Sequence, residues 1–147
     1  MSYRQTYYHI VFATKRRSPI LNEEKQAELF KYIWGIIKNK KCFLHRINGH
    51  KDHIHMLVDI HPTISLSSFV KEVKASSSIW IKEKQFFTKF DGWGNGYGAF
   101  TVGHKHKNRV VEYIKNQQVH HAKLSFREEI IQLFEEHGIV YDEKYLL

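Results

Sequence analysis

Two histidines separated by one residue, His53 and His55, form the sharpest local pattern in the sequence. Side chains alternate between the two faces of a β-strand, so residues at i and i+2 point the same way. Both imidazoles would then leave one face of a sheet close together, which suits two ligands of one Mn, Zn, Fe, Ni or Cu ion. The alternative interpretation is a pair of exposed histidines on a sheet surface, and the H-x-H pattern alone does not decide between them.

A tyrosine and a glutamine four residues apart, Tyr113 and Gln117, form a second pattern. Residues at this spacing stack on one face of a helix, so their side chains would be neighbours. The amide oxygen of Gln117 could complete a metal site, with the Tyr113 hydroxyl beside the ion. A tyrosine in the core or at an interface explains the same spacing, and only the combination with His53 and His55 favours chemistry.

Other patterns exclude classes of function or carry little information. The sequence has no H-E-x-x-H and no C-x-x-C motif, which disfavours zincin-type proteases, zinc ribbons and nucleobase deaminases. The single cysteine, Cys42, cannot form an intramolecular disulfide. The glycine-rich stretch 92–98 lacks the G-K-[ST] ending of a phosphate-binding loop, so it is interpreted as a flexible, mobile connection. His104 and His106 are flanked by glycine and lysines, which indicates a solvated loop.

The elements that must position these residues follow from hydrophobic periodicity and turn residues. Strands are predicted over Tyr7–Ala13, Cys42–Asn48, His53–Ile60 and Gly98–Val102. Helices are predicted from Asn22 to about Lys40, from Ser65 or Ser67 to about Lys84, over Asn108–His121 and over Ser125–His137. The order β-α-β-β-α-β with two further helices is typical of an α+β, ferredoxin-like fold, an antiparallel sheet with helices on one face. Ligands and catalytic groups would lie on the free face of that sheet.

Length and charge indicate a single domain with an anionic partner. The 147 residues are predicted to form one domain over 1–147, and 23 Lys+Arg against 15 Asp+Glu give a net charge of +8. Nucleic acid is the simplest anionic partner, although the charge could also serve solubility alone. The chain shows no signal peptide and no apolar run long enough for a bilayer, so a soluble cytoplasmic protein without a membrane partner is expected.

Binding of single strands needs cations for phosphates and aromatic rings for bases. Tyr3 and Tyr7 are candidate stacking residues. Each cation could equally be a solvated surface charge. The candidate phosphate contacts are Arg4, Lys15, Arg16, Arg17, Lys105, Lys107 and Arg109.

In four segments the sequence resembles the single-tyrosine transposases of the IS200/IS605 group, which belong to the HUH nuclease superfamily. The segments follow in the same order and spacing as in that family, and together with a C-terminal pattern over 134–146 they span most of the chain. They are Tyr8–Phe12, Asp52–Val58, Trp93–Val102 and Tyr113–His121.

The resemblance implies a role for each residue of the two patterns. His53, His55 and Gln117 would be the metal ligands, with Mg²⁺ or Mn²⁺ as the ion, and Tyr113 would be the nucleophile. Manganese suits two imidazoles better, because magnesium prefers oxygen ligands. His120 and His121 are expected to be surface or interface residues without an assigned role.

The resemblance also implies the reaction and its partners. A chain of this kind would cleave and rejoin single-stranded DNA at hairpin-marked element ends through a 5′-phosphotyrosine link, without a small-molecule substrate. Two subunits would form a homodimer in which the tyrosine helix of one completes the site of the other. Three alternatives stay open: a domesticated relative that cleaves chromosomal repeat hairpins, a non-catalytic nucleic-acid-binding module, and a metal-dependent hydrolase that uses water.

Overall fold

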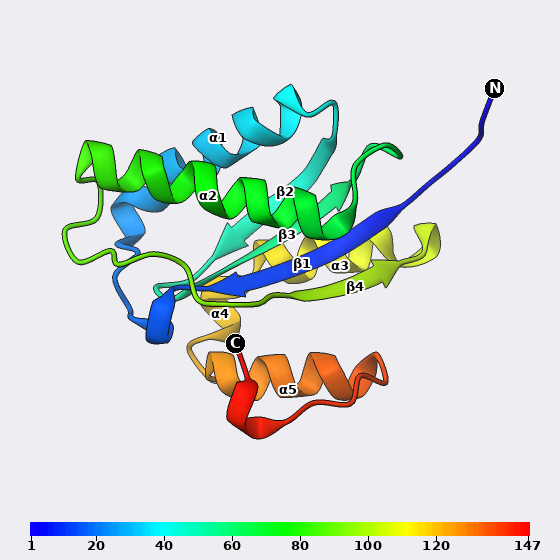
Figure 1. The fold of residues 1–147 in the computed structure, drawn as a ribbon. Helices are drawn as coiled ribbons and strands as arrows, with labels where there is room; N and C mark the ends of the chain where they lie inside the picture. The colour runs from blue at the N-terminus through cyan, green and yellow to red at the C-terminus, as the bar shows by residue number, and fades with distance from the viewer.

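Four antiparallel strands form one sheet in the computed structural model, which describes residues 1–147 (Figure 1). The strands are Tyr7–Ala13 (β1), Phe43–Gly49 (β2), His53–Asp59 (β3) and Gly98–Val102 (β4), and they lie in the order β2-β3-β1-β4. The predicted ferredoxin-like sheet is therefore confirmed, and each strand begins and ends within one residue of its expected bounds. β1 and β3 are the central strands, so the histidine pair of β3 lies in the middle of the sheet.

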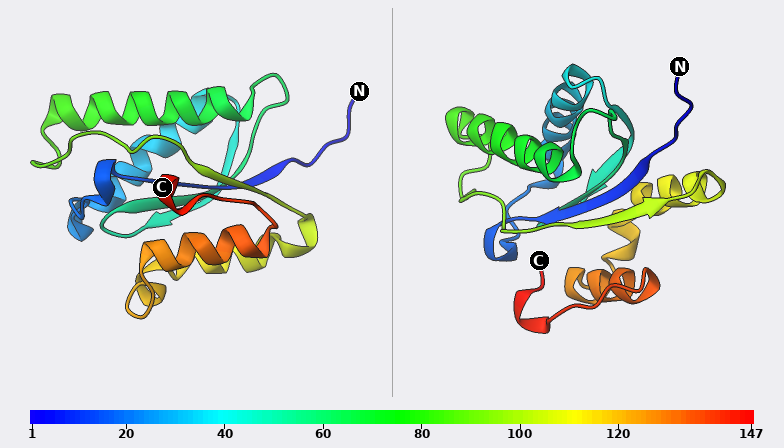
Figure 2. Two further views of the ribbon diagram at one scale, coloured as in Figure 1. Left: turned by 60° about the horizontal axis from the view of Figure 1, so that its bottom comes forward. Right: turned by 45° about the vertical axis from the view of Figure 1, so that its right-hand side comes forward.

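Two long helices, Glu23–Asn39 (α1) and Leu66–Lys84 (α2), cover one face of the sheet (Figure 2). The main core lies between them and the sheet, because every second residue of β1 and β3 is apolar and points to this side. The helices contribute apolar residues at helical spacing. Among the fully buried members are Ile10, Phe12, Ile33, Ile54, Met56, Phe69 and Ile81.

The other face of the sheet is covered as well, so the expectation of a free face is wrong. Three helices, Lys107–Lys115 (α3), Gln117–His120 (α4) and Phe126–Glu136 (α5), lie on this side (Figure 2). The reason is hydrophobic: Val11, Ala13 and Phe100 point to this face, and α5 buries them under an apolar stripe. The part of this face that lies under these helices is consequently enclosed, and it includes His53 and His55, which are fully buried.

A break at Asn116 divides the predicted helix Asn108–His121. α3 ends at Lys115, Asn116 has φ −96° and ψ 23°, and α4 begins at Gln117. Asparagine has low helix propensity because its side chain competes for backbone hydrogen bonds. The prediction of one continuous helix is therefore wrong, and Tyr113 and Gln117 lie in different helical segments.

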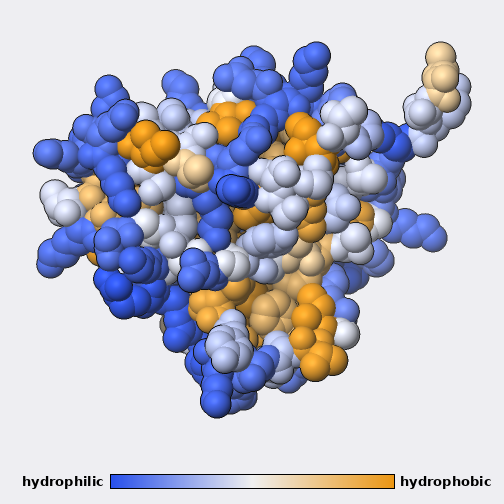
Figure 3. Space-filling view, in the orientation of Figure 1, coloured by the Kyte–Doolittle hydropathy of each residue, from blue (hydrophilic) through white to orange (hydrophobic).

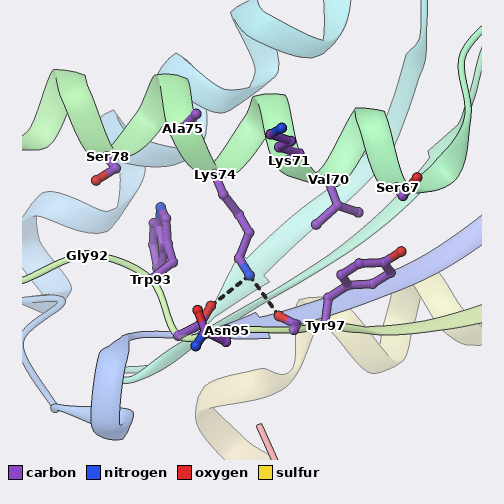
Figure 4. A pocket seen from close by; sticks show the side chains of 12 residues that line it. Ser67, Val70, Lys71, Lys74, Ala75, Ser78, Gly92, Trp93, Asn95 and Tyr97 are labelled. Atoms are coloured by element: carbon purple, nitrogen blue, oxygen red, sulfur yellow. Dashed lines mark hydrogen bonds between the residues drawn. The ribbon is translucent and has the colours of Figure 1, made fainter.

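The glycine-rich stretch before β4, expected to be a flexible connection, is instead held against α2 (Figure 4). The Lys74 ammonium donates to the carbonyl oxygens of Gly94 (2.8 Å) and Gly96 (2.7 Å). The indole N–H of Trp93 donates to the Ser77 hydroxyl at 2.9 Å. The loop and α2 enclose an open hollow of about 460 Å³ on the face of the molecule away from the histidine pair.

The surface of the molecule is largely hydrophilic in the view of Figure 3, with smaller apolar areas in its upper half and a larger one over α5 and the C-terminal segment. Leu146 and Leu147 pack against the apolar cluster below the sheet, while Val140 is 98% exposed. No helix in the structure has both the length and the apolar character that crossing a membrane requires.

The Lys74 contact predicts a measurable contribution to stability. Replacing Lys74 by Met should lower the free energy of unfolding by about 1.5–3 kcal/mol, because two carbonyls lose a charged hydrogen-bond donor. Lys71→Met is the matched control, since Lys71 is an exposed lysine on the same helix. Urea denaturation of both variants measures the effect, and equal losses for the two would contradict the role given to Lys74.

Candidate active site

The two histidines of β3 point to the face covered by the C-terminal helices, as strand alternation predicts. His53 and His55 are both fully buried, with ring centroids 5.1 Å apart. The ring of Phe126 on α5 stacks on His53 at 4.2 Å. The alternative of two exposed histidines on a sheet surface is therefore wrong.

His53 is oriented by the residue that precedes it in the chain. The Nδ1–H of His53 donates to Asp52 Oδ1 at 2.7 Å, which turns Nε2 toward Gln117 Oε1 at 3.0 Å and Glu129 Oε1 at 3.4 Å. A carboxylate on one ring nitrogen fixes the orientation of the ring and makes the other nitrogen a better metal ligand. Asp52 therefore aims Nε2 of His53 at the centre of the site.

A buried carboxylate, Glu129 of α5, lies at that centre and is only 1% exposed. Its Oε1 accepts hydrogen bonds from His55 Nε2 (3.0 Å) and His121 Nε2 (2.9 Å). Its Oε2 accepts from Gln117 Nε2 at 2.9 Å and from the Tyr113 hydroxyl. Because a buried carboxylate is costly unless it is paired, these four donors explain how Glu129 can lie in the interior.

Sequence reasoning missed Glu129, although one signal was available. The residue lies on the buried side of α5, three positions after Phe126 and four before Leu133, which are both apolar. A charged residue within an apolar helical stripe needs a partner in the interior. The start of α5 is itself fixed by a capping box, in which Ser125 and Glu128 bind each other's backbone N–H groups.

The sequence-predicted pair Tyr113 and Gln117 does reach the histidines, despite the helix break between them. Gln117 is fully buried against His53, and the half-buried Tyr113 has its ring 5.9 Å from that of His55. The tyrosine therefore lies beside the histidines of its own chain.

Three further histidines surround the pair. His9 of β1 shares a hydrogen bond of 2.8 Å between its Nε2 and Nδ1 of His55. The side chain of His121 is 3% exposed and binds Glu129, so of its two expected places, surface or interface, the surface is wrong. The ring of His120 lies 4.7 Å from that of Tyr113, and its Nε2 is buried without a hydrogen-bond partner.

Burial and hydrogen bonding shift the pKa values of the two histidines of β3 in opposite directions. Burial lowers the pKa of His55 to about 4, outweighing the attraction of Glu129. Burial also disfavours charge on His53, but its hydrogen bonds to Asp52 and Glu129 prevail and raise its pKa to about 9. At neutral pH, His53 carries a proton on Nε2 while His55 is neutral.

The pKa values of Glu129 and Tyr113 are also shifted, by burial and by contacts within the same cluster. Burial would raise the pKa of Glu129, but the hydrogen bonds from His121, His53 and His55 hold that pKa well below its usual range. Burial and the adjacent Glu129 carboxylate raise the pKa of Tyr113. In this arrangement the tyrosine is a neutral phenol facing a carboxylate.

The donor set fits a divalent metal ion. One ligand atom each of His53, His55 and Glu129 lies within 4.8 Å of the others, and all three residues are buried. Gln117 Oε1, the oxygen proposed as a ligand from sequence, is 3.0 Å from His53 Nε2. Two imidazoles with carboxylate and amide oxygens suit manganese better than magnesium, which prefers an all-oxygen shell.

The cations proposed to bind DNA fall into two groups at opposite ends of β1. Lys15, Arg16 and Arg17 form a short helix after the end of β1, where Lys15 and Arg16 pair with Asp91 at 3.8 Å and 2.8 Å. Arg17 lines a hollow together with Lys144 of the C-terminal segment. None of these three has a side-chain contact with the histidine cluster.

The second group lies around the start of α3. Lys105 and Arg109 are exposed, and the ammonium of Lys107 lies 5.7 Å from the centre of the Tyr7 ring. Arg4 binds Asp59 at 2.7 Å. Tyr3, the other proposed stacking residue, is 90% exposed.

Two solved structures that share this fold are described as transposases. A candidate transposase from Deinococcus radiodurans aligns over 80% of this chain and 95% of its own, with a TM-score of 0.62 and 24% identity. A REP-associated tyrosine transposase bound to a REP hairpin aligns over 82% of this chain and 74% of its own, with a TM-score of 0.60 and 19% identity. These likenesses show a shared fold.

Sequence comparison goes further and shows the family. Residues 2–117 match the family described as "Transposase IS200 like". The transposase for insertion sequence element IS200 of Salmonella typhimurium is 35% identical over 115 residues, which is 75% of each chain. The ISDra2 transposase TnpA of Deinococcus radiodurans is 25% identical over 118 residues, which is 77% of this chain and 84% of the relative. The chain therefore belongs to the IS200-like transposases, as the sequence motifs predicted.

The lowered pKa of His55 predicts how stability depends on pH in metal-free protein. The folded chain leaves His55 neutral down to about pH 4, whereas the unfolded chain protonates it near pH 6.5. The unfolded state binds more protons within this window, so the free energy of unfolding should fall as pH decreases, by up to about 3 kcal/mol. Burial lowers the pKa of His9 too, which adds a slope of the same sign.

Denaturation in urea with a chelator, at several pH values across this window, measures the slope. His55→Gln should flatten it, whereas His106→Gln, a change at an exposed histidine, should leave it intact. The same slope in wild type and His55→Gln would show that His55 is not the group responsible.

Proposed function

We propose that this chain cleaves and rejoins single-stranded DNA at hairpin-marked element ends, with Tyr113 as the nucleophile and a bound Mg²⁺ or Mn²⁺ ion. One observation carries the proposal: the Tyr113 hydroxyl and the buried imidazoles of His53 and His55 converge on the same carboxylate, Glu129. A nucleophile beside a set of metal-ligand atoms is what phosphodiester cleavage requires.

The ligands would be His53 and His55, with oxygen from Gln117, Glu129 or both. The ion would offset the negative charge on a non-bridging phosphate oxygen and so favour attack on phosphorus. Asp52 would hold His53 in the orientation that presents Nε2, and its place next to His53 in the chain makes this orientation inherent to the motif. Binding of the ion would also displace the proton of His53 Nε2.

Tyr113 would form the new bond. Its phenolic oxygen loses its proton and attacks phosphorus, and the bond from phosphorus to the 3′ oxygen breaks. The 3′ oxygen takes up a proton, so the strand that leaves carries a 3′-hydroxyl while the other stays joined as a 5′-phosphotyrosine. Since this link conserves the energy of the broken bond, a 3′-hydroxyl of another strand can reverse the step and join DNA without ATP. Strand transfer therefore follows from the use of a tyrosine in place of water.

Glu129 would control when Tyr113 can react. The carboxylate accepts the hydrogen bond of the phenol and disfavours the phenolate, which is the reactive form. If Glu129 turns to the ion, its negative charge is offset and the barrier to forming the phenolate falls. The arrangement seen here is then a resting state in which the tyrosine is positioned and protonated.

The partners follow from charge and from the relatives. The net charge of +8 favours a phosphate backbone, and one structural neighbour is a tyrosine transposase bound to a REP hairpin. Identity to the IS200 transposase favours an insertion-sequence end as the substrate over a chromosomal repeat. A homodimer is expected from the family. Its subunits would either exchange their tyrosine helices or keep each Tyr113 at the site of its own chain, and the second arrangement is the one that the single chain described here has.

Metal binding is tested without catalysis. Manganese added to chelator-treated protein should raise its Tm and release protons, and calorimetry in buffers of different ionisation enthalpy counts those protons. His53→Ala should weaken binding at least about tenfold, because loss of a mere hydrogen-bond partner of a ligand already costs about 10- to 100-fold. Parallel titrations of Gln117→Ala and Glu129→Gln show which oxygen is the ligand, and absence of any binding by wild type would contradict the metal site.

Covalent catalysis is tested by trapping the link to DNA. Wild-type protein incubated with manganese and a hairpin-bearing single strand should form an adduct that survives denaturation. Tyr113→Phe should form none, because it lacks the nucleophilic oxygen, whereas Tyr97→Phe, a change on the face of the sheet away from the site, should form it normally. His53→Ala should lose the adduct but keep hairpin binding. An equal adduct from Tyr113→Phe would show that another group attacks.

A further inference from the structure

Aromatic residues gather at the far end of the sheet face that carries the histidine pair. Tyr7 of β1 and Phe43 of β2 both lie opposite Asp59 of β3, one on each side, so the three residues form a row across the sheet. Asp59 follows His55 by four residues, which is about 13 Å along the strand, and points to the same face. The row therefore lies on the same face of the sheet as the histidines of the candidate active site.

A β-bulge adds a third ring to this row. The pairing of β2 with β3 shifts between Leu44 and Arg46, which leaves His45 as the extra residue. Such a bulge re-aims a side chain. The His45 ring centroid consequently lies 4.7 Å from that of Phe43 and 4.9 Å from that of Tyr7. We name the rings of Tyr7, Phe43 and His45 the ring platform.

The ring platform is exposed at Phe43, half-buried at Tyr7 and His45, and flanked by positive charge. Phe43 is 63% exposed on an edge strand, although a phenylalanine would be buried if it served only the core. Lys107 lies over the Tyr7 ring at 5.7 Å, and the Tyr7 hydroxyl is 3.4 Å from Nδ1 of His104. The acidic residue of the row, Asp59, is neutralised by Arg4 at 2.7 Å.

We propose that the ring platform stacks an unpaired base of the DNA strand whose phosphodiester lies at Tyr113. The inference rests on the proposed function and adds a binding site for a base. Exposed rings beside cations are the combination by which proteins hold single strands, because every base has a π-face and every link a phosphate. The 13 Å between the row and His55 corresponds to about four nucleotides of a stacked strand.

Binding of a strand that cannot be cleaved tests the ring platform. In a Tyr113→Phe background, Phe43→Ala should lower affinity for a labelled hairpin oligonucleotide with single-stranded flanks by about 5- to 100-fold, the loss expected for one stacked base. Phe43→Trp should keep the affinity. Ile79→Ala is the control, because Ile79 is an apolar residue, 58% exposed, on α2, which covers the other face.

Oligonucleotides with one abasic position each locate the stacked base. Removing the base at one position in a flank should weaken binding to protein that retains Phe43. The same abasic position should not lower the affinity of Phe43→Ala any further. Unchanged affinity of Phe43→Ala, or an abasic effect independent of Phe43, would overturn the inference. So would a change of subunit association in Phe43→Ala with affinity per subunit unchanged, since the platform would then contact a second copy.

The two proposals fail separately. A Tyr113 adduct in a protein whose DNA binding does not depend on Phe43 would reject the ring platform alone. Binding that depends on Phe43 in a protein that forms no adduct would reject the nucleophile and leave the base-stacking site in place.

Discussion

The site depends on one buried charge, the carboxylate of Glu129. Four side chains from β3, α3 and the segment around α4 donate hydrogen bonds to its two oxygens, so this single group joins the sheet to all three C-terminal helices. An unpaired carboxylate in the interior would be strongly unfavourable, which makes the arrangement of its partners mutually dependent. The position of the tyrosine relative to the histidines is therefore a result of electrostatics as much as of packing.

Much of the framework could be predicted from local patterns. The period of two in β3 placed His53 and His55 on one face, and turn residues gave the strand bounds, because both signals act within a few residues. Tyr113 and Gln117 were also found, although the reasoning assumed one continuous helix and the structure breaks it at Asn116. The two side chains are joined through their hydrogen bonds to Glu129. This tertiary contact takes the place of the direct i, i+4 contact on one helix that the sequence predicted.

What could not be predicted depends on contacts between distant segments. Glu129 is 74 residues from His55 in the chain, and only its place in an apolar stripe distinguished it from a solvated glutamate. The same holds for His121, whose side chain is buried against Glu129 of α5. The covered sheet face was missed because the fold pattern alone says nothing of where additional helices pack, whereas the apolar residues Val11 and Phe100 required a cover.

The family match spans residues 2–117 and so ends at Gln117, while Glu129 lies beyond it on α5. The histidines, the tyrosine and the amide thus belong to one part of the chain, and the charge that restrains them belongs to another. A change confined to α5 would alter the ionic surroundings of Tyr113 without touching any motif residue. A substitution in α5 can therefore change the reactivity of the tyrosine while every residue of the sequence motifs stays the same.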